Sequence, residues 1–124
     1  MNTPATMAAA LLASVAQAEA ETRAIVETGA LHVKNEGRAN ALASAPARHA
    51  HAPHAITYDV AQQPTGTQAE IGYDKSKRGG ALGNLLEFGG GGDHSPPHLD
   101  LERALTAEEP RFVGAFRLMA QRLL

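Results

Sequence analysis

The residues of this 124-residue sequence that could do chemistry are, first, three closely spaced histidines, His49, His51 and His54. Neutral imidazole is a common ligand for divalent metals, so such a cluster could bind one. No acidic residue lies beside the cluster to orient the rings, and a His-x-His pair in a loop has no fixed geometry. We therefore interpret the histidines as a polar loop, and we expect no metal site and no cofactor.

A second candidate is the basic run formed by Lys75, Lys77 and Arg78, which precedes Gly79 and Gly80. A phosphate-binding loop has its glycines first and ends in Lys-Ser or Lys-Thr, so the order here is reversed. We interpret the run as a solvated surface. Contact with DNA or a partner protein in an assembly is the alternative.

The sequence contains no set of residues with the pattern of a nucleophilic catalytic site. No serine stands in a nucleophile-elbow motif, and the carboxylates follow the pattern of helix surfaces and caps. His94 and His98 are four residues apart, but the prolines between them prevent the helix that would align their rings. We predict that the protein is not an enzyme.

Composition favours one domain that gains stability from partners. The chain is 44% hydrophobic but only 4% aromatic, and alanine, which buries little area per residue, supplies much of the apolar content. A net charge of −2 gives no overall attraction to nucleic acid or an anionic membrane. The absence of cysteine excludes a disulfide scaffold and a thiolate zinc site.

The first elements expected are a long helix and a hairpin. A stripe with helical spacing predicts a helix over residues 5 to 43: Leu11, Val15, Ala18, Thr22, Ile25, Gly29 and Val33. Gly29 either lets another element approach closely or breaks the helix in two. Alternation of Ile56, Tyr58 and Val60 predicts a strand over 55–60, and a second strand over 69–73 pairs with it across a turn at 62–67.

The N-terminus also has features of a secretory signal. Residues 7–13 form an apolar run, and Ala16-Gln17-Ala18 matches a small-x-small cleavage site. Residues 1–6 lack Lys and Arg, and the helical pattern continues through the cleavage site, so we expect this segment to remain as helix. An exported, His-rich metal-binding protein that uses this signal is the alternative function.

The remaining elements follow the stretch Leu85-Leu86-Glu87-Phe88-Gly89. We expect a short helix with Leu85, Leu86 and Phe88 packed inward, Phe88 as a core anchor, and Glu87 at its edge accepting a hydrogen bond that fixes the loop. The glycines that follow end the helix. The resulting fold class is α+β: a long N-terminal helix, an antiparallel β-hairpin or small sheet, a short helix and a C-terminal helix.

The C-terminal helical region begins around Leu99, Leu101 and Leu105. Proline is favoured at the first position of a helix, so Glu109 is expected to cap a final helix that starts at Pro110. Four residues at helical spacing form the apolar face of this helix: Phe112, Phe116, Met119 and Leu123.

This order of elements, the Leu-Glu-Phe-Gly motif and the proline-led last helix resemble a family of tailed-bacteriophage neck proteins. The family comprises tail-completion, minor tail and head-to-tail connector proteins of the lambda Z type, and the resemblance covers residues 5 to 124 as a single domain. Its Val-Glu-Phe-Gly-Thr motif is matched by Leu86, Glu87, Phe88 and Gly89. A second motif, Pro-Phe-Leu-Arg-Pro-Ala-Leu, is matched only at Leu101, Ala104 and Leu105.

The resemblance implies a structural protein of the virion neck, assembled in the host cytoplasm. Its members form a ring, usually six-fold, between head-completion proteins and the tail terminator or tail tube. DNA passes through the lumen without sequence-specific binding. A ring requires a head-to-tail interface that closes by rotation. We expect the apolar faces of the first and last helices, together with the hairpin as an arm, to form that interface.

Overall fold

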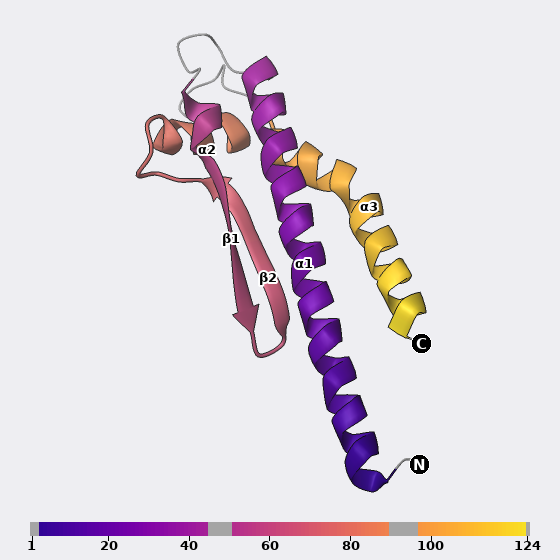
Figure 1. The fold of residues 1–124 in the computed structure, drawn as a ribbon. Helices are drawn as coiled ribbons and strands as arrows, with labels where there is room; N and C mark the ends of the chain where they lie inside the picture. Colours follow the sequence, from indigo (N-terminus) through magenta and orange to yellow (C-terminus); the bar gives the residue numbers. More distant parts are fainter. Residues whose placement is uncertain (1–2, 45–50, 90–96, 124) are drawn as a thin grey trace.

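The computed structural model describes residues 3–44, 51–89 and 97–123. Its elements, in chain order, are α1 (Pro4–Ser44), the 3-10 helix η2 (Ala52–Ala55), β1 (Ile56–Gln63), β2 (Gly66–Tyr73), α2 (Gly80–Phe88) and α3 (Asp100–Leu123). The predicted α+β class is confirmed. Figure 1 shows α1 as the longest element, with the hairpin on one side and α3 on the other.

α1 is one uninterrupted helix whose start is capped by its own residues. The Thr3 Oγ1 accepts a hydrogen bond from the Thr6 backbone N–H at 3.2 Å, and the Thr6 Oγ1 accepts one from the Thr3 N–H at 2.8 Å. Pro4 occupies the first helical position, where its missing N–H costs no bond. Gly29 does not break the helix. A Cβ at this glycine would lie 3.1 Å from the Phe112 ring, so it permits close approach of α3.

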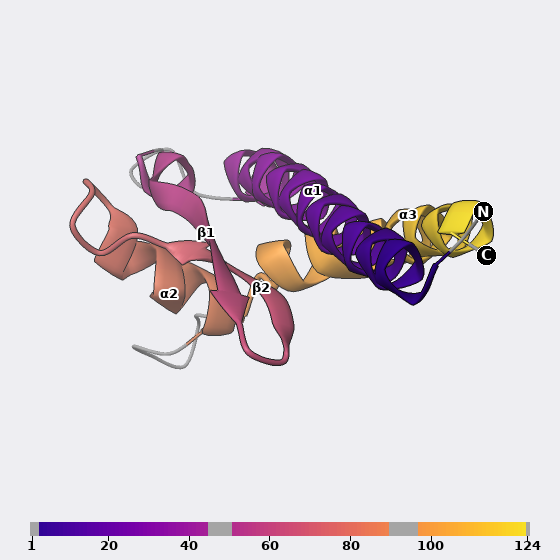
Figure 2. The same cartoon turned by 60° about the horizontal axis from the view of Figure 1, so that its bottom comes forward.

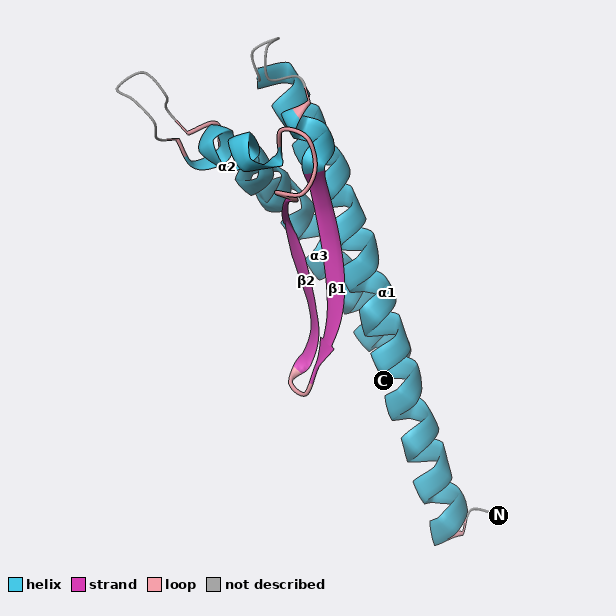
Figure 3. Ribbon diagram, turned by 90° about the vertical axis from the view of Figure 1, so that its left-hand side faces the viewer, coloured by secondary structure: helices cyan, strands magenta, loops and turns pink. Residues whose placement is uncertain are grey.

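β1 and β2 form an antiparallel pair that runs from Ile56 opposite Tyr73 to Gln63 opposite Gly66. The hairpin is therefore confirmed. Its connection is shorter than predicted, because pairing continues through Gln62 and Thr67 to a two-residue turn. Figure 3 shows the hairpin lying along α1. Arg38 of α1 anchors the start of the hairpin by donating hydrogen bonds to the carbonyls of Pro53 (3.2 Å) and Ile56 (3.0 Å).

α3 returns antiparallel to α1 and is continuous. Leu101 lies against Gly37, Phe112 against Gly29 and Met119 against Thr22. The predicted helix start at Pro110 is wrong, since Pro110 lies inside α3. A proline inside a helix loses one backbone hydrogen bond. Contacts with α1 on both sides of this proline hold α3 in one piece despite that loss.

The hydrophobic core lies where η2, the base of the hairpin and the C-terminal half of α1 meet. It consists of Ala41, Ala52, Ala55, Ile56 and Tyr73, with Ile71, Leu86 and Leu101 packed against it. The other end of α1 is different: residues 4–20, which we call the arm, extend past the hairpin and α3 (Figure 1). Every arm residue is exposed except the half-buried Ala18.

Candidate functional site

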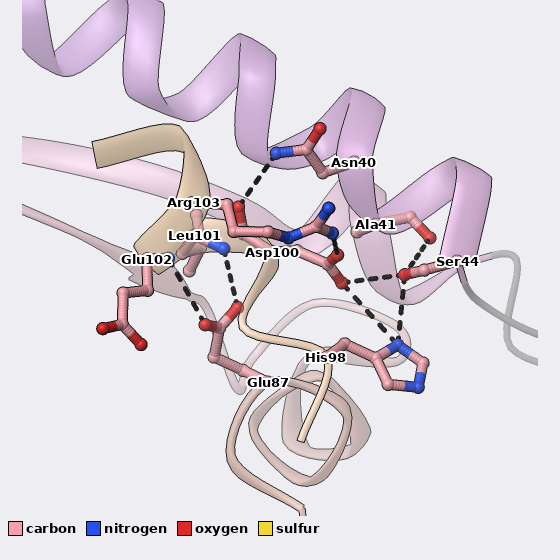
Figure 4. A network of polar contacts seen from close by, with 9 residues as sticks. All are labelled: Asn40, Ala41, Ser44, Glu87, His98, Asp100, Leu101, Glu102 and Arg103. Carbon is pink, nitrogen blue, oxygen red and sulfur yellow. Dashed lines mark hydrogen bonds and ion pairs between the residues drawn. The ribbon is translucent and has the colours of Figure 1, made fainter. Parts of the chain in front are cut away.

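The end of α2 and the start of α3 cap each other through Glu87. This carboxylate is only 2% exposed and accepts hydrogen bonds from the backbone N–H groups of Leu101 (2.8 Å) and Glu102 (3.4 Å). In return, the N–H groups of His98 and Leu99 donate to the carbonyls of Leu86 (2.9 Å) and Glu87 (3.1 Å). Unpaired backbone groups at both helix ends are thereby satisfied, as Figure 4 shows for the Glu87 side chain.

A second carboxylate, Asp100, joins this capped joint to the end of α1. Asp100 is 1% exposed and lies 2.5 Å from the Arg103 guanidinium. Ser44 donates a hydrogen bond to it at 2.9 Å, and Asn40 donates to its backbone carbonyl at 3.1 Å. We call the set of Asn40, Ser44, Glu87, His98, Asp100 and Arg103 the polar junction. Its buried carboxylates are paired, as burial of charge requires.

Tyr73 lies beside the polar junction, and the negative charges of the junction contribute to the pKa of its hydroxyl. Burial, and then the negative charges of Asp100 and Glu87, raise the pKa of Tyr73 to about 12. Each of these factors disfavours the tyrosinate. The hydroxyl itself has no hydrogen-bond partner among the described residues. This environment favours neutral or cationic neighbours and disfavours another anion.

Ser44, His98 and Asp100 have the residue types of a catalytic triad but not its arrangement. In a triad the two nitrogens of the imidazole face the serine and the carboxylate separately. Here the Ser44 Oγ and the Asp100 Oδ2 both approach the same atom, His98 Nδ1, at 3.1 and 3.7 Å. Ser44 also donates directly to Asp100. This geometry suits a structural tie between α1 and α3 rather than proton relay.

The four motif residues lie at the end of α2, and their orientation corrects the sequence analysis. Phe88 is 70% exposed and Leu85 is half exposed, so the prediction that they pack inward, with Phe88 as a core anchor, is wrong. Leu86 does pack against the core, and Gly89 ends the helix with φ 75°. Glu87 does accept hydrogen bonds, but it is buried rather than at the edge.

The basic residues predicted for DNA or partner contact are adjacent in space. Lys75, Lys77 and Arg78 occupy one exposed turn between β2 and α2. Asp74 holds the turn by accepting hydrogen bonds from the Ser76 hydroxyl (2.6 Å) and backbone N–H (2.9 Å). These two bonds lower the pKa of Asp74, hydroxyl first and then backbone. Contact of this turn with DNA or protein stays a prediction.

The histidine cluster is only partly described. His49 lies outside the described residues, as do residues 90–96 of the glycine run and the diproline segment. His51 and His54 are exposed at either end of the first turn of η2. Residues 3–44, 51–89 and 97–123 contain no group of three side chains placed to hold a metal ion.

An apolar groove runs between α1, β2 and α3. Its volume is about 370 Å³, and its walls come from Val26, Gly29, Ala30 and Val33 of α1, Thr67, Ala69 and Ile71 of β2, and Leu105, Glu108, Glu109 and Phe112 of α3. Figure 2 shows the first turns of α3 passing beside β2. Leu105 is 58% exposed although it lines this groove.

Glu108 fixes the α3 side of the groove. Its carboxylate is buried, and its Oε1 lies 2.9 Å from His32 Nδ1. Its Oε2 lies 2.9 Å from Arg111 Nη2, close enough for an ion pair, although the angles do not satisfy a hydrogen bond. Arg111 also reaches Glu36 of α1 at 3.3 Å. The burial of Asp100 and Glu108 was not predicted, because the carboxylates were assigned to helix surfaces and caps. Their spacing of eight residues around the buried Ala104 was the available signal.

Comparison with known proteins gives no relative, since no protein-family model, curated protein or solved structure matches the chain. Within the described part of the chain, no helix is both long and apolar enough to cross a membrane.

Proposed function

We propose that this protein is a structural component of the neck of a tailed phage, which joins head to tail or completes the tail as part of a ring. It acts by assembly and not by catalysis. The proposal rests on the resemblance carried by Leu86, Glu87, Phe88 and Gly89, and on the agreement between the fold and the expected order of elements.

The structural observation that best supports the assembly part of the proposal is the exposure of the arm. Residues 3–18 contain no charged side chain, yet Leu11 and Leu12 are 67% and 71% exposed. Met7 and Val15 are more than half exposed as well. A contiguous apolar surface of this kind marks a site of protein or membrane contact. In an assembly protein, further copies of the chain would cover this surface, so its exposure supports that class of protein.

The charge distribution is compatible with a ring around DNA. The net charge is −2, and three of the eleven lysines and arginines, Lys75, Lys77 and Arg78, lie together in one exposed turn. A lumen with few fixed cations lets DNA pass, because each lysine or arginine that neutralises a phosphate adds to the affinity. In this arrangement the ring contacts head-completion proteins on one side and the tail terminator or tail tube on the other.

The test is electron microscopy of lysates from a phage in which this reading frame is interrupted. We expect DNA-filled heads separate from tails, or joined particles that fail to infect. Wild-type protein supplied from a plasmid is the control and should restore infectious particles. Normal infectious virions from the interrupted phage would refute the neck assignment.

A further inference from the structure

We infer that the arm of one copy docks into the apolar groove of the next copy, so that each groove is completed by residues 4–20 of a neighbour. The inference rests on the proposed function, because a ring is the assembly that it explains. It adds the two surfaces that meet and the orientation in which they do so.

The described residues of the chain leave most of the arm without a packing partner. α3 lies against α1 from Gly37 to Thr22, and its last described contact there is the ion pair of Arg122 with Glu21 at 3.5 Å. The described residues leave positions 4–17 exposed. Isolated helices of this length are marginal in water, and most helical stability in proteins comes from packing. A bound partner would supply that packing.

The groove has the chemistry to receive an uncharged helix. Its walls are mainly apolar, and Leu105 in the groove is largely exposed. A helix with charged side chains would lose their hydration there without gaining partners. Residues 4–18 of the arm bring none, and their alanines allow the helix axis to approach closely while Met7, Leu11 and Val15 extend along one side of it.

Charge also sets the direction of docking. The N-terminus of a helix carries a partial positive charge, and the first turn of α1 contains no acidic side chain to neutralise it. The groove carries Glu108, which is paired, and Glu109, which is exposed at its rim. We therefore expect the start of the arm to lie near Glu109 of the receiving copy.

In this proposal the arm that fills a groove comes from a second copy, because a chain's own arm cannot reach its own groove. The arm and the groove residues Val26 to Val33 belong to one continuous helix, so the arm cannot fold back onto them. Arm and groove are different surfaces, which makes the contact heterologous. Heterologous contacts form closed rings when the rotation between copies closes. Each copy then gives one arm and receives one, so every subunit buries two patches.

The test uses two charge substitutions in the full chain, Leu11→Glu in the arm and Leu105→Glu in the groove. Both side chains are exposed, so neither change disturbs the core of the subunit. Leu118→Glu is the matched control, since Leu118 is equally exposed on α3 but lies outside arm and groove. Sedimentation velocity over a concentration series measures assembly, and circular dichroism checks that each variant is folded.

We expect the wild type and the Leu118→Glu variant to self-associate. The Leu11→Glu and Leu105→Glu variants should stay monomeric at concentrations at least tenfold above those at which the wild type associates. Mixing these two variants is decisive. The intact arm of Leu105→Glu fits the intact groove of Leu11→Glu, so the mixture should form a one-to-one dimer and nothing larger.

Several results would overturn the inference. A wild-type chain that stays monomeric would do so, as would a Leu105→Glu variant that assembles normally while Leu11→Glu does not, which indicates arm-to-arm pairing. Wild type that floats with phosphatidylcholine–phosphatidylglycerol vesicles without self-associating would assign the arm to a membrane. If rings form in both variants, this interface is wrong and the neck function stands. Normal virions from the interrupted phage refute only the function.

Discussion

Replacing Glu87 by alanine removes the acceptor that caps α3 while leaving the hydrophobic core intact. Hydrogen bonds to a charged group contribute roughly 1.5–3 kcal/mol each, and loss of a helix cap costs about 1 kcal/mol. The bond to the Leu101 N–H is short at 2.8 Å, whereas the bond to Glu102 is long at 3.4 Å and contributes less. We expect Glu87→Ala to lower the free energy of unfolding by about 3 kcal/mol.

Urea unfolding followed by far-ultraviolet circular dichroism measures this change as a lower midpoint with an unchanged slope. The conservative variant Glu87→Gln keeps one acceptor oxygen and should lose about half as much. The matched control is the neighbouring Phe88→Ala, because that ring is 70% exposed. We expect it to change the stability of the subunit by less than about 0.5 kcal/mol.

These two variants distinguish stabilisation through the Glu87 cap from stabilisation through burial of the Phe88 ring. If Phe88→Ala costs as much as Glu87→Ala, the aromatic ring is the anchor and the orientation of α2 described above is incorrect. If Glu87→Ala is neutral, the carboxylate does not cap α3. Either result would refute the argument for the polar junction.

Three further changes have expected outcomes. The pKa of Tyr73 is raised to about 12, first by burial and then by Asp100 and Glu87. Tyrosine in the unfolded chain ionises near pH ~10. The contribution of Tyr73 to stability is therefore constant below pH ~10 and falls as the pH rises from about 10 to 12. Tyr73→Phe should flatten this decline in urea midpoints measured against pH, and should cost little at neutral pH because the hydroxyl has no described partner; an unchanged alkaline decline would contradict this. Gly83→Ala places a Cβ against the Tyr73 ring and should cost roughly 2 kcal/mol or more in calorimetry, whereas the control Gly114→Ala meets nothing within 4 Å and should stabilise by about 0.5–1 kcal/mol. Asp100→Asn weakens the contacts that join α3 to α1 and should lower the thermal midpoint, and an unchanged midpoint would show that this tie contributes nothing.

The elements that follow a simple periodicity were predictable from the sequence. α1 matches the helix expected over residues 5–43 within one residue at each end, since its stripe repeats over many turns. The hairpin follows from alternation in two short runs separated by a glycine-bearing turn. In both cases local pattern and tertiary packing favour the same structure.

The prediction failed where the buried face carries polar or small residues. In α2 the buried positions are Gly80, Gly83 and Glu87, at helical spacings of three and four, so Leu85 and Phe88 point outward. Counting apolar residues assigns the opposite face to the core. Tyr73 needs the space that Gly83 leaves, and Glu87 is needed as a cap. Neither requirement is visible until the neighbouring elements are placed.

The candidate site shows the same limit. Glu87 was identified as an acceptor, but its donors belong to α3, more than ten residues further along the chain. Asp100 and Glu108 are buried because Ser44, Arg103, His32 and Arg111 pair with them. These partners come from distant positions on α1 or from the next turn of α3. Sequence spacing alone does not reveal such pairings.

The continuity of α1 has a mechanical consequence. A helix of 41 residues is about 60 Å long, and it carries the arm at one end and Ser44 of the polar junction at the other. Such a rod tilts as a unit, so a small rotation at the groove becomes a larger displacement at both ends. In the proposed ring, docking of one arm would therefore strain the polar junction of the same copy. Neighbouring subunits would thus be coupled through stiffness, without any change of fold.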